Sequence, residues 1–241
     1  MLVPIAAGTG ALVFAGFHTM LPKSQLYGRT FIGEPCRSKR LAVTFDDGPN
    51  DPHTLRILDV LANYEVKATF FVVGKFAERR PEIVRAAAAA GHEIGNHTYS
   101  HPNLILRGSS QVRREIVQCE SVIRDAAGVS CNLFRPPWGG RRPGTLRAIR
   151  GAGYEPVLWS AAGYDWKAKS AQQIVDNLAR QVNGGEVILL HDGDHRAPDG
   201  DRTLTVAAID LLLRRYRDEG YEFVTVSQMM KPAAVPGGNL P

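Results

Sequence analysis

The sequence predicts an α/β fold in which about seven parallel strands form a barrel within a single domain. From Leu41 onward, short apolar runs rich in β-branched and aromatic residues alternate with longer amphipathic segments, which is typical of βα units and a parallel sheet. Runs such as Val187–Leu190 are continuously apolar, as expected for strands covered on both faces. In a barrel, polar residues at the strand ends would meet at one mouth. An open doubly wound sheet is the alternative.

The expected elements follow from the alternation of apolar runs and helical patterns, and several of the helices end at a glycine. The expected strands are Leu41–Phe45, Lys67–Val73, Glu93–His97, Asn132–Arg135, Tyr154–Trp159, Glu186–His191 and Tyr221–Val226. The expected helices are His53–Asn63, Pro81–Ala90, Ser109–Ala127, Pro143–Ala152, Ala171–Val182 and Thr203–Glu219. Pro81 suits the first position of a helix, and glycine suits the position after a helix, as at Gly91, Gly128, Gly153, Gly184 and Gly220. We see no internal repeat and no interdomain linker.

Charge and composition are those of an ordinary globular domain. The 241 residues fit one large α/β domain, and a chain of this size can bury roughly 70% of its unfolded surface. The net charge of +5 and the pI near 9.2 invite a nucleic-acid interpretation. However, no stretch alternates basic and aromatic residues, as a groove for single-stranded nucleic acid would require. The basic residues occur instead as scattered pairs, mostly on expected helices: Arg79–Arg80, Arg113–Arg114, Arg141–Arg142 and Arg214–Arg215. We therefore expect no nucleic-acid partner.

The cysteines and the N-terminus leave questions of compartment open. Cys36, Cys119 and Cys131 form neither a disulfide framework nor a CxxC pair, and a bridge between Cys119 and Cys131 stays open. Residues 2–17 carry no charge, but the first Lys comes only at position 23. A membrane anchor or uncleaved signal, a cleaved signal and a packed helix are the three interpretations. Membrane contact through residues 2–20 would place the chain at the cell envelope, with a cytoplasmic location as the alternative.

Two adjacent carboxylates follow the first expected strand, in the sequence Thr-Phe-Asp46-Asp47-Gly-Pro. Neighbouring side chains at a strand end point in different directions. One carboxylate can therefore bind a metal while the other faces a substrate as a base. An ordinary Asp-Gly turn after a strand is the alternative.

Two imidazoles, His97 and His101, lie four residues apart. One helical turn would set both on the same face, a spacing suited to two ligands of one ion. Two surface histidines before a loop are the alternative. Together with Asp47 they form a set of three ligands with an open position, as in catalytic zinc sites. Cobalt, manganese, nickel or iron would accept the same nitrogen and oxygen ligands.

Three further strand ends carry polar residues. Arg135 can pair with a carboxylate, and the rigid Pro-Pro-Trp138-Gly loop that follows leaves the Trp138 N–H as an oxyanion donor, unless it is only a packing loop. His191 ends a buried strand and is a candidate general acid, with Asp165 raising its pKa and holding its tautomer. A structural histidine is the alternative. We expect the polar loop Asp192–Arg202, which includes His195, to be solvated; contact with the substrate is the alternative.

The ordered set TFDDGP, NHTYSHP, RPPWG, YDW and ILLHDG resembles the five motifs of the polysaccharide deacetylase family (carbohydrate esterase family four, the NodB-homology domain). TFFVVG at Thr69–Gly74 also resembles the second strand of that family. The resemblance covers about residues 41–226. It implies a distorted (β/α) barrel, one divalent metal with zinc preferred, and deacetylation of N-acetylglucosamine polymers or of O-acetylated xylan.

Carried over by position, the resemblance assigns a role to each motif residue. It implies that Asp46 is the base, that Arg135 supports it, and that His191 is the acid oriented by Asp165. It makes Asp47, His97 and His101 the metal ligands. The expected substrate-binding residues are Trp138, Pro137, Trp166 and Leu189. One departure is Ala162, where family members often carry a further Asp three residues before the one at Asp165.

The resulting expectation is a metal-dependent hydrolase that removes acetyl groups from N-acetylated sugars of a peptidoglycan- or chitin-like polysaccharide or a glycolipid. An O-acetyl esterase on acetylated xylan and a hydrolase of another non-peptide amide are the alternatives. A sugar-binding module that has lost catalysis would lack a ligand or the base, and none is missing. We expect residues 1–40 to form an apolar segment and linker, 41–230 the catalytic domain, and 231–241 a flexible tail. The protein is expected to be a monomer.

Overall fold

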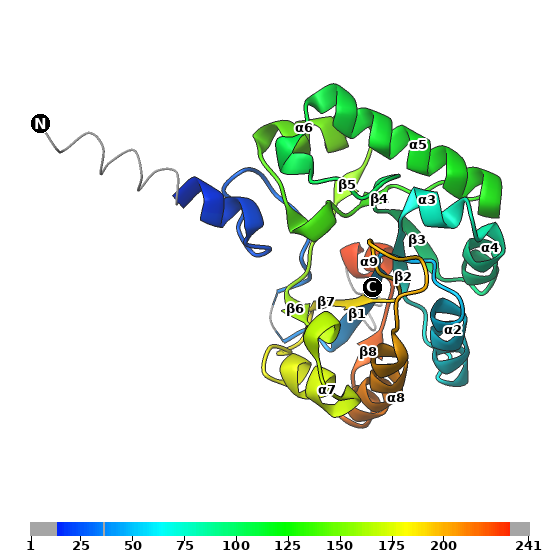
Figure 1. Ribbon diagram of the computed structural model, residues 1–241. Helices are drawn as coiled ribbons and strands as arrows, with labels where there is room; N and C mark the ends of the chain where they lie inside the picture. Colours follow the sequence, from blue (N-terminus) through cyan, green and yellow to red (C-terminus); the bar gives the residue numbers. More distant parts are fainter. Residues whose placement is uncertain (1–13, 36, 232–241) are drawn as a thin grey trace, which may run out of the picture.

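A computed structural model describes residues 14–35 and 37–231, and its framework is a curled sheet with the order β5-β4-β3-β2-β1-β7-β6 (Figure 1). An eighth strand, β8, pairs with the start of β1. All strand pairs are parallel. The strands are β1 Arg40–Asp46, β2 Thr69–Val72, β3 Glu93–Asn96, β4 Leu133–Phe134, β5 Glu155–Pro156, β6 Ala161–Ala162, β7 Val187–His191 and β8 Glu222–Phe223.

Helices surround the outside of the sheet, so that the strands lie in the middle of Figure 1 and the helices around its rim. The helices are α2 His53–Asn63, α3 Gly74–Ala77, α4 Pro81–Ala89, α5 Ser109–Ala127, α6 Pro143–Gly151, α7 Ala171–Ala179, α8 Thr203–Asp218 and α9 Val226–Met230. The expected single-domain, distorted (β/α) barrel is thereby confirmed. The long helix α5 ends where Gly128 adopts a left-handed conformation with φ 69°, which favours glycine because it lacks a Cβ.

Most elements begin and end near their expected positions, and the exceptions have physical causes. The expected strand Tyr221–Val226 is wrong at its end, because α9 starts at Val226. Thr225 caps α9 by accepting from the backbone N–H of Gln228, whose side chain accepts from the Thr225 N–H in return. This reciprocal cap follows a known sequence signature. The short strand β6 was not predicted, because two alanines have little strand propensity.

Alternation along β1 and β7 decides which side chains face the centre of the barrel. Val43 and Phe45 of β1 belong to the large apolar core under the helices, whereas Ala42 belongs to a smaller cluster that includes residues of α9. Since side chains alternate between faces, Asp46 lies on the same face as Ala42. Its register partner on β7 is His191. The two strands therefore bring Asp46 and His191 to the same level at the carboxyl end of the sheet.

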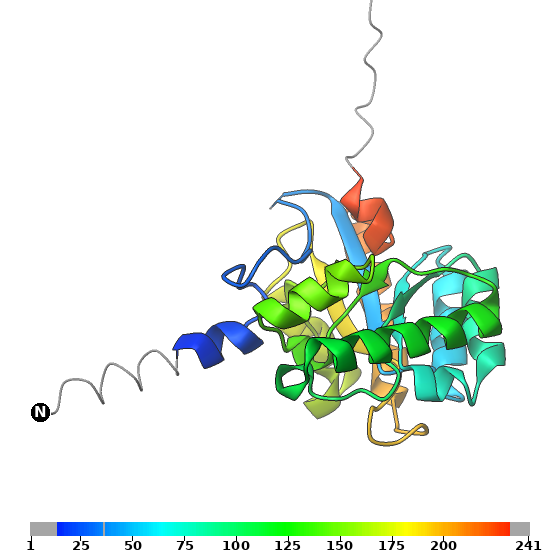
Figure 2. The same cartoon turned by 90° about the horizontal axis from the view of Figure 1, so that it is seen from above.

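The described part of the N-terminal region is tied to the barrel. Residues 14–20 are helical and lie beside α6 (Figure 2). Further along, Phe31 forms a parallel bridge with Val157, and Gly33 forms an antiparallel bridge with Glu186. Among residues 14–35 and 37–231, no helix has both the length and the apolar character needed to cross a membrane. Residues 1–13 of the expected apolar segment, Cys36 and the tail from residue 232 lie outside the described residues.

Two features away from the strand ends complete the fold. Cys119 and Cys131 are buried and free, so the bridge that the sequence left open is not formed.

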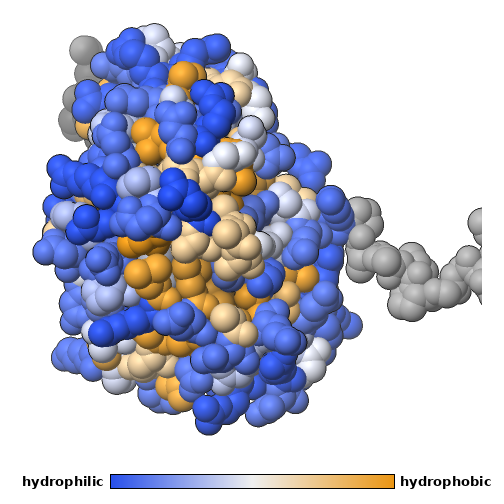
Figure 3. Space-filling view, turned by 90° about the vertical axis from the view of Figure 1, so that its right-hand side faces the viewer, coloured by the Kyte–Doolittle hydropathy of each residue, from blue (hydrophilic) through white to orange (hydrophobic). Residues whose placement is uncertain are grey.

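Figure 3 shows the side of the molecule over α2 and α4, where a band of apolar residues runs between hydrophilic ones. Exposed apolar residues of these helices include Ala86 and Ala89 of α4 and Leu55 of α2.

Candidate active site

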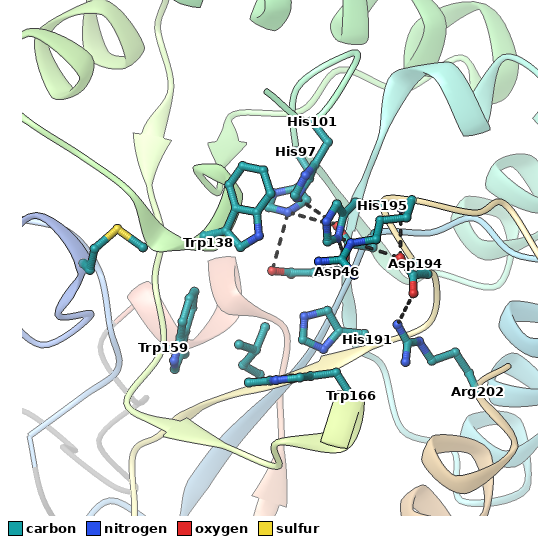
Figure 4. Close-up of a pocket in the computed structure, with 14 residues that line it drawn as sticks. Asp46, His97, His101, Trp138, Trp159, Trp166, His191, Asp194, His195 and Arg202 are labelled. Carbon is teal, nitrogen blue, oxygen red and sulfur yellow. Dashed lines mark hydrogen bonds and ion pairs between the residues drawn. The ribbon is translucent and has the colours of Figure 1, made fainter. Parts of the chain in front are cut away.

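The carboxyl ends of the strands surround a pocket of about 490 Å³. In Figure 4, Asp46 lies between His97 and His191, with Trp138 and Trp159 on one side and Arg202 on the other. The expected site residues that line this pocket are Asp46, Asp47, His97, His101, Trp138, Trp166, Leu189 and His191. The remaining three, Arg135, Asp165 and Pro137, are buried behind the wall.

Asp47, His97 and His101 form a candidate metal site. One ligand atom from each lies within 4.8 Å of the others, and all three residues are buried. Oδ1 of Asp47 lies 3.5 Å from Nε2 of His97 and 3.1 Å from Nε2 of His101. Yet Oδ1 accepts no hydrogen bond, so neither imidazole is aligned to donate to it. Three donor atoms that converge without bonding one another suit a divalent cation between them.

Metal ligands must be deprotonated to bind, and the pKa values of His97 and Asp47 favour that state. Burial lowers the pKa of His97 to about 4, so its imidazole is neutral at pH 7. Its Nδ1 lies 2.7 Å from the Arg135 carbonyl and donates to it, which leaves the Nε2 lone pair free for a cation. Burial alone would raise the pKa of Asp47, but the imidazoles of His101, His195 and His97 hold it well below its usual range.

The two histidines are brought together by a loop, so the expected helical turn is wrong. Strand β3 ends at Asn96, and both Thr98 and His101 have positive φ, at 70° and 58°. The Asn96 side chain accepts from the Thr98 backbone N–H at 2.9 Å, and the Thr98 hydroxyl accepts from the His101 N–H at 3.0 Å. These short-range bonds fold the loop back over β3, and the ring centroids of the two histidines lie 4.9 Å apart.

Asp46 is held by a buried arginine. Nη1 of Arg135 donates to Oδ1 of Asp46 at 2.6 Å and to the Thr44 hydroxyl at 2.7 Å. The Arg135 guanidinium lies over the Phe71 ring, 4.1 Å from its centroid, and is fully buried. A charged partner offsets the cost of burying the guanidinium, and Asp46 supplies it. The carboxylate keeps its second oxygen, Oδ2, toward His97 at 3.8 Å.

His191 is held in one orientation by Asp165. Its Nδ1 donates to Oδ1 of Asp165 at 2.9 Å, and its backbone N–H donates to Oδ2 at 2.8 Å. The hydroxyl of Thr205 on α8 also donates to Oδ2, at 2.9 Å. Burial would lower the pKa of His191, but Asp165 raises it to about 9. The imidazole is therefore a cation at neutral pH, with its Nε2–H free to face the pocket.

Trp138 forms one wall of the pocket. Its indole is 43% exposed and meets the His101 ring edge-on, with centroids 4.4 Å apart. The residue has φ 54°, a conformation that is uncommon for large side chains and that clusters at functional sites. Asp47, with φ 73°, and Tyr164, with φ 52°, share it. The strained backbone aims Trp138 at the metal ligands and away from the core.

Known proteins are similar to this chain over most of its length. A family model described as polysaccharide deacetylase matches residues 33–157. The chain belongs to the polysaccharide deacetylase family. It is 38% identical over 205 residues to a peptidoglycan-N-acetylglucosamine deacetylase of Bacillus cereus, a match that covers 85% of this chain and 73% of the relative. The resemblance expected from the motifs is thus confirmed.

Two further relatives support the assignment to the polysaccharide deacetylase family. The chain is 40% identical over 201 residues to a chitooligosaccharide deacetylase of Sinorhizobium fredii, covering 81% of this chain and 94% of the relative. The crystal structure of the Bc1960 peptidoglycan N-acetylglucosamine deacetylase matches with a TM-score of 0.77 at 37% identity. That match covers 83% of this chain and 91% of the crystallised one.

His195 was not among the expected site residues of this polysaccharide deacetylase, yet it lines the pocket beside the candidate metal group. Nδ1 of His195 lies 3.4 Å from Oδ2 of Asp47, and its ring stacks on His101 with centroids 4.5 Å apart. The expectation that its loop is simply solvated is therefore wrong at this position. The loop is held there by contacts distant in sequence, among them the Lys75 amino group, which donates to the His195 carbonyl at 3.2 Å. No local sequence signal points to this contact.

Ala162, where family members often carry an Asp, does not line the pocket. Ala162 of β6 is buried, and its backbone exchanges hydrogen bonds with the Gln181 side chain at 3.2 and 2.9 Å. Ala162 therefore forms no hydrogen bond with His191 or with the candidate metal ligands. The orientation of His191 is supplied instead by Asp165 and Thr205.

Proposed function

We propose that this chain hydrolyses the acetamido group of N-acetylglucosamine units in a peptidoglycan- or chitin-like polymer. The Bacillus and Sinorhizobium relatives are named for peptidoglycan N-acetylglucosamine and for chitooligosaccharides, which share that sugar. The observation that carries the proposal is the placement of Asp46 and His191 beside the Asp47–His97–His101 group. A base and an acid that flank one cation site are what amide hydrolysis requires.

The residues present fit one divalent cation, and we propose zinc. Two imidazole nitrogens and one carboxylate oxygen, with a position left open toward the pocket, are typical of catalytic zinc sites. The orphaned Oδ1 of Asp47 supports a cation at this point. When bound, the cation would polarise the acetyl carbonyl and lower the pKa of a water toward ~7.

Asp46 is proposed as the general base. Its Oδ1 is engaged by Arg135, and this charge-assisted bond fixes the orientation of the carboxylate. Its Oδ2 faces the pocket near His97, where it can accept a proton from the attacking water. Asp46 is therefore assigned to proton transfer and Asp47 to the cation, which divides the roles of two adjacent residues.

His191 is proposed as the general acid that protonates the leaving nitrogen. An amine leaves poorly unless it is protonated, so an amidase needs a donor at this position more than an ester hydrolase does. With its Nδ1–H bonded to Asp165, the imidazolium has only Nε2–H to offer the substrate. The indole of Trp166 meets the His191 ring edge-on at 5.1 Å between centroids, and together with Trp138 and Leu189 it would bind the sugar and its acetyl group.

Acetate release tests the proposal. The purified protein, stripped with chelator and reloaded with zinc, is incubated with N-acetylated peptidoglycan fragments, chitooligosaccharides and acetylated xylan. Release from the first two, abolished by chelator and restored by zinc, is the expected result. Release from acetylated xylan alone would overturn N-deacetylation in favour of ester hydrolysis. Since the proposed polymers lie outside the cytoplasmic membrane, we place the activity at the cell envelope.

A further inference from the structure

The N-terminal segment of residues 14–24 reaches the pocket, although the proposed reaction gives it no part. Met20 lines the pocket together with Trp138 and Trp159, and 46% of Met20 is exposed. In Figure 4 the segment, in blue, lies on the side of the pocket where Trp138 and Trp159 are labelled, away from Arg202. A stretch of chain distant in sequence from every catalytic motif thus contributes an apolar side chain to the pocket.

Arg141 holds this segment through hydrogen bonds to its backbone. Its side chain is only 1% exposed. Nη2 donates to the carbonyls of Leu21 at 2.7 Å, Ser24 at 2.5 Å and Pro22 at 3.3 Å. The Arg141 backbone N–H donates to the Thr19 carbonyl at 3.2 Å. In the sequence this arginine is only one of several scattered basic pairs, whereas in the structure it is buried and its partners are backbone carbonyls.

The same guanidinium also holds the loop that carries Trp138. Nη1 of Arg141 donates to the Gly139 carbonyl at 3.1 Å, directly after Trp138. One rigid, planar group therefore fixes the Met20 segment and the Trp138 loop relative to each other. Burying a guanidinium is unfavourable unless its donors are satisfied. A buried arginine at this junction is thus better explained by fixed geometry than by added stability.

Internal bonds keep the segment in shape. The Tyr27 hydroxyl donates to the Ala15 carbonyl at 2.9 Å, and the His18 ring lies 2.8 Å from the Ser24 hydroxyl. Further along the chain, Phe31 forms a parallel β-bridge with Val157, the residue after β5. The segment that carries Met20 is therefore held on both sides of that residue, and a fixed segment reduces the cost of ordering a binding contact.

We propose that Met20 is part of a subsite for a sugar next to the unit that is deacetylated, and that Arg141 is its positioning residue. The inference rests on the proposed function. A pyranose ring presents an apolar C–H face, and ligand pockets combine apolar and aromatic walls with a few polar groups. Met20, Trp138 and Trp159 form such a wall beside the metal site. The segment would therefore favour polymers over short substrates.

Chain-length dependence tests the subsite. For Met20→Ala, the ratio of kcat/KM on the N-acetylglucosamine pentamer to that on the dimer should fall by about tenfold, the order expected for a lost apolar contact. The loss should lie in the KM for the pentamer, with kcat little changed, and Met20→Leu should restore it. Leu26→Ala, an exposed apolar change in the same region and outside the pocket, is the matched control. An unchanged ratio in Met20→Ala would overturn the inference.

Arg141→Lys tests the positioning role, because lysine keeps the charge but lacks the planar fork. The same fall in the ratio is expected, with zinc affinity equal to wild type. If Arg141→Lys does not fold, Met20→Ala and Met20→Leu decide alone.

Wild-type protein that deacetylates no sugar would overturn the proposed function. In that case pentamer binding, followed by tryptophan fluorescence, still separates the two: equal binding by wild type and Met20→Ala would overturn the subsite as well.

Discussion

Nη1 of Arg135 donates to Oδ1 of Asp46 at 2.6 Å, and both side chains are almost fully buried. The bond uses one carboxylate oxygen and leaves the other toward the pocket. The candidate metal group contains an oxygen of Asp47 together with His97 and His101, and it does not include Asp46. The two adjacent aspartates should therefore respond differently to substitution.

Asp46→Asn should lower kcat by at least about 100-fold, because a positioned general base contributes roughly 10² to 10⁴ in rate. Zinc affinity should stay at the wild-type level, since the proposal assigns Asp46 to proton transfer and not to the cation. Steady-state kinetics and calorimetric zinc titration measure the two effects. Arg214→Gln, an exposed change on α8, should alter neither. Equal kcat in Asp46→Asn and Arg214→Gln would refute the base assignment.

His101→Ala should have the opposite signature. Mutation of a residue that only hydrogen-bonds to a metal ligand typically lowers metal affinity by about 10- to 100-fold. Removal of a ligand itself should therefore weaken zinc binding by more than about 100-fold. Activity should then be lost at zinc concentrations that saturate the wild-type protein. Zinc titration of the purified variant gives the affinity. A wild-type zinc affinity in His101→Ala would show that the cation is not held by this group.

The sequence predicted what is local and missed what the fold assembles. Helices α2 and α5 have the expected bounds because their periodic patterns are bounded by local signals. The motif residues were found because each motif is a short stretch after a strand. Conversely, Thr205 supports Asp165 from a helix distant in sequence, and no spacing rule connects them.

Arg141 and His195 show the same limit more sharply. In the sequence Arg141 is one of two adjacent arginines, and only the path of residues 19–24 reveals why it is buried. His195 belongs to a polar loop, and only the approach of that loop to Asp47 gives it a neighbour in the site. Charge and polarity alone describe a solvated residue equally well. Such residues become visible only when the chain is folded.

His195 should tune the metal site through Asp47. The imidazole lies against Oδ2, which leaves Oδ1 to converge with Nε2 of His97 and of His101. Because partners of ligating carboxylates orient them, His195→Ala should weaken zinc binding by about 10- to 100-fold. His195→Asn, whose amide can still donate, should recover part of the affinity. Asp199→Asn, an exposed change in the same loop, is the control, and an affinity equal to that control in His195→Ala would contradict this role.

The pKa of His191 predicts the alkaline limb of the activity profile. Burial would lower the pKa of the imidazole, but Asp165 raises it to about 9. Because a general acid must carry its proton, kcat/KM should fall as pH rises through about 9. Asp165→Asn removes the charge that holds the proton, so the limb should move toward the ordinary value of 6.5. A pH profile of kcat/KM for the two proteins measures the shift.

The unfolding free energy of the metal-free protein should follow the same group. The folded-state pKa of His191, about 9, lies above the ordinary value of 6.5, so protonation stabilises the folded state. This contribution is fully present below pH 6.5 and is lost as pH rises through about 9. Urea unfolding should therefore show wild type losing stability over this window and Asp165→Asn losing less.

Thr205→Val is the milder variant for the pH profile of kcat/KM. It removes only the hydroxyl that donates to Asp165 and keeps the carboxylate, so it should shift the alkaline limb of that profile less than Asp165→Asn does. Equal limbs in wild type and Asp165→Asn would contradict the pairing of His191 with Asp165 as the source of its proton affinity.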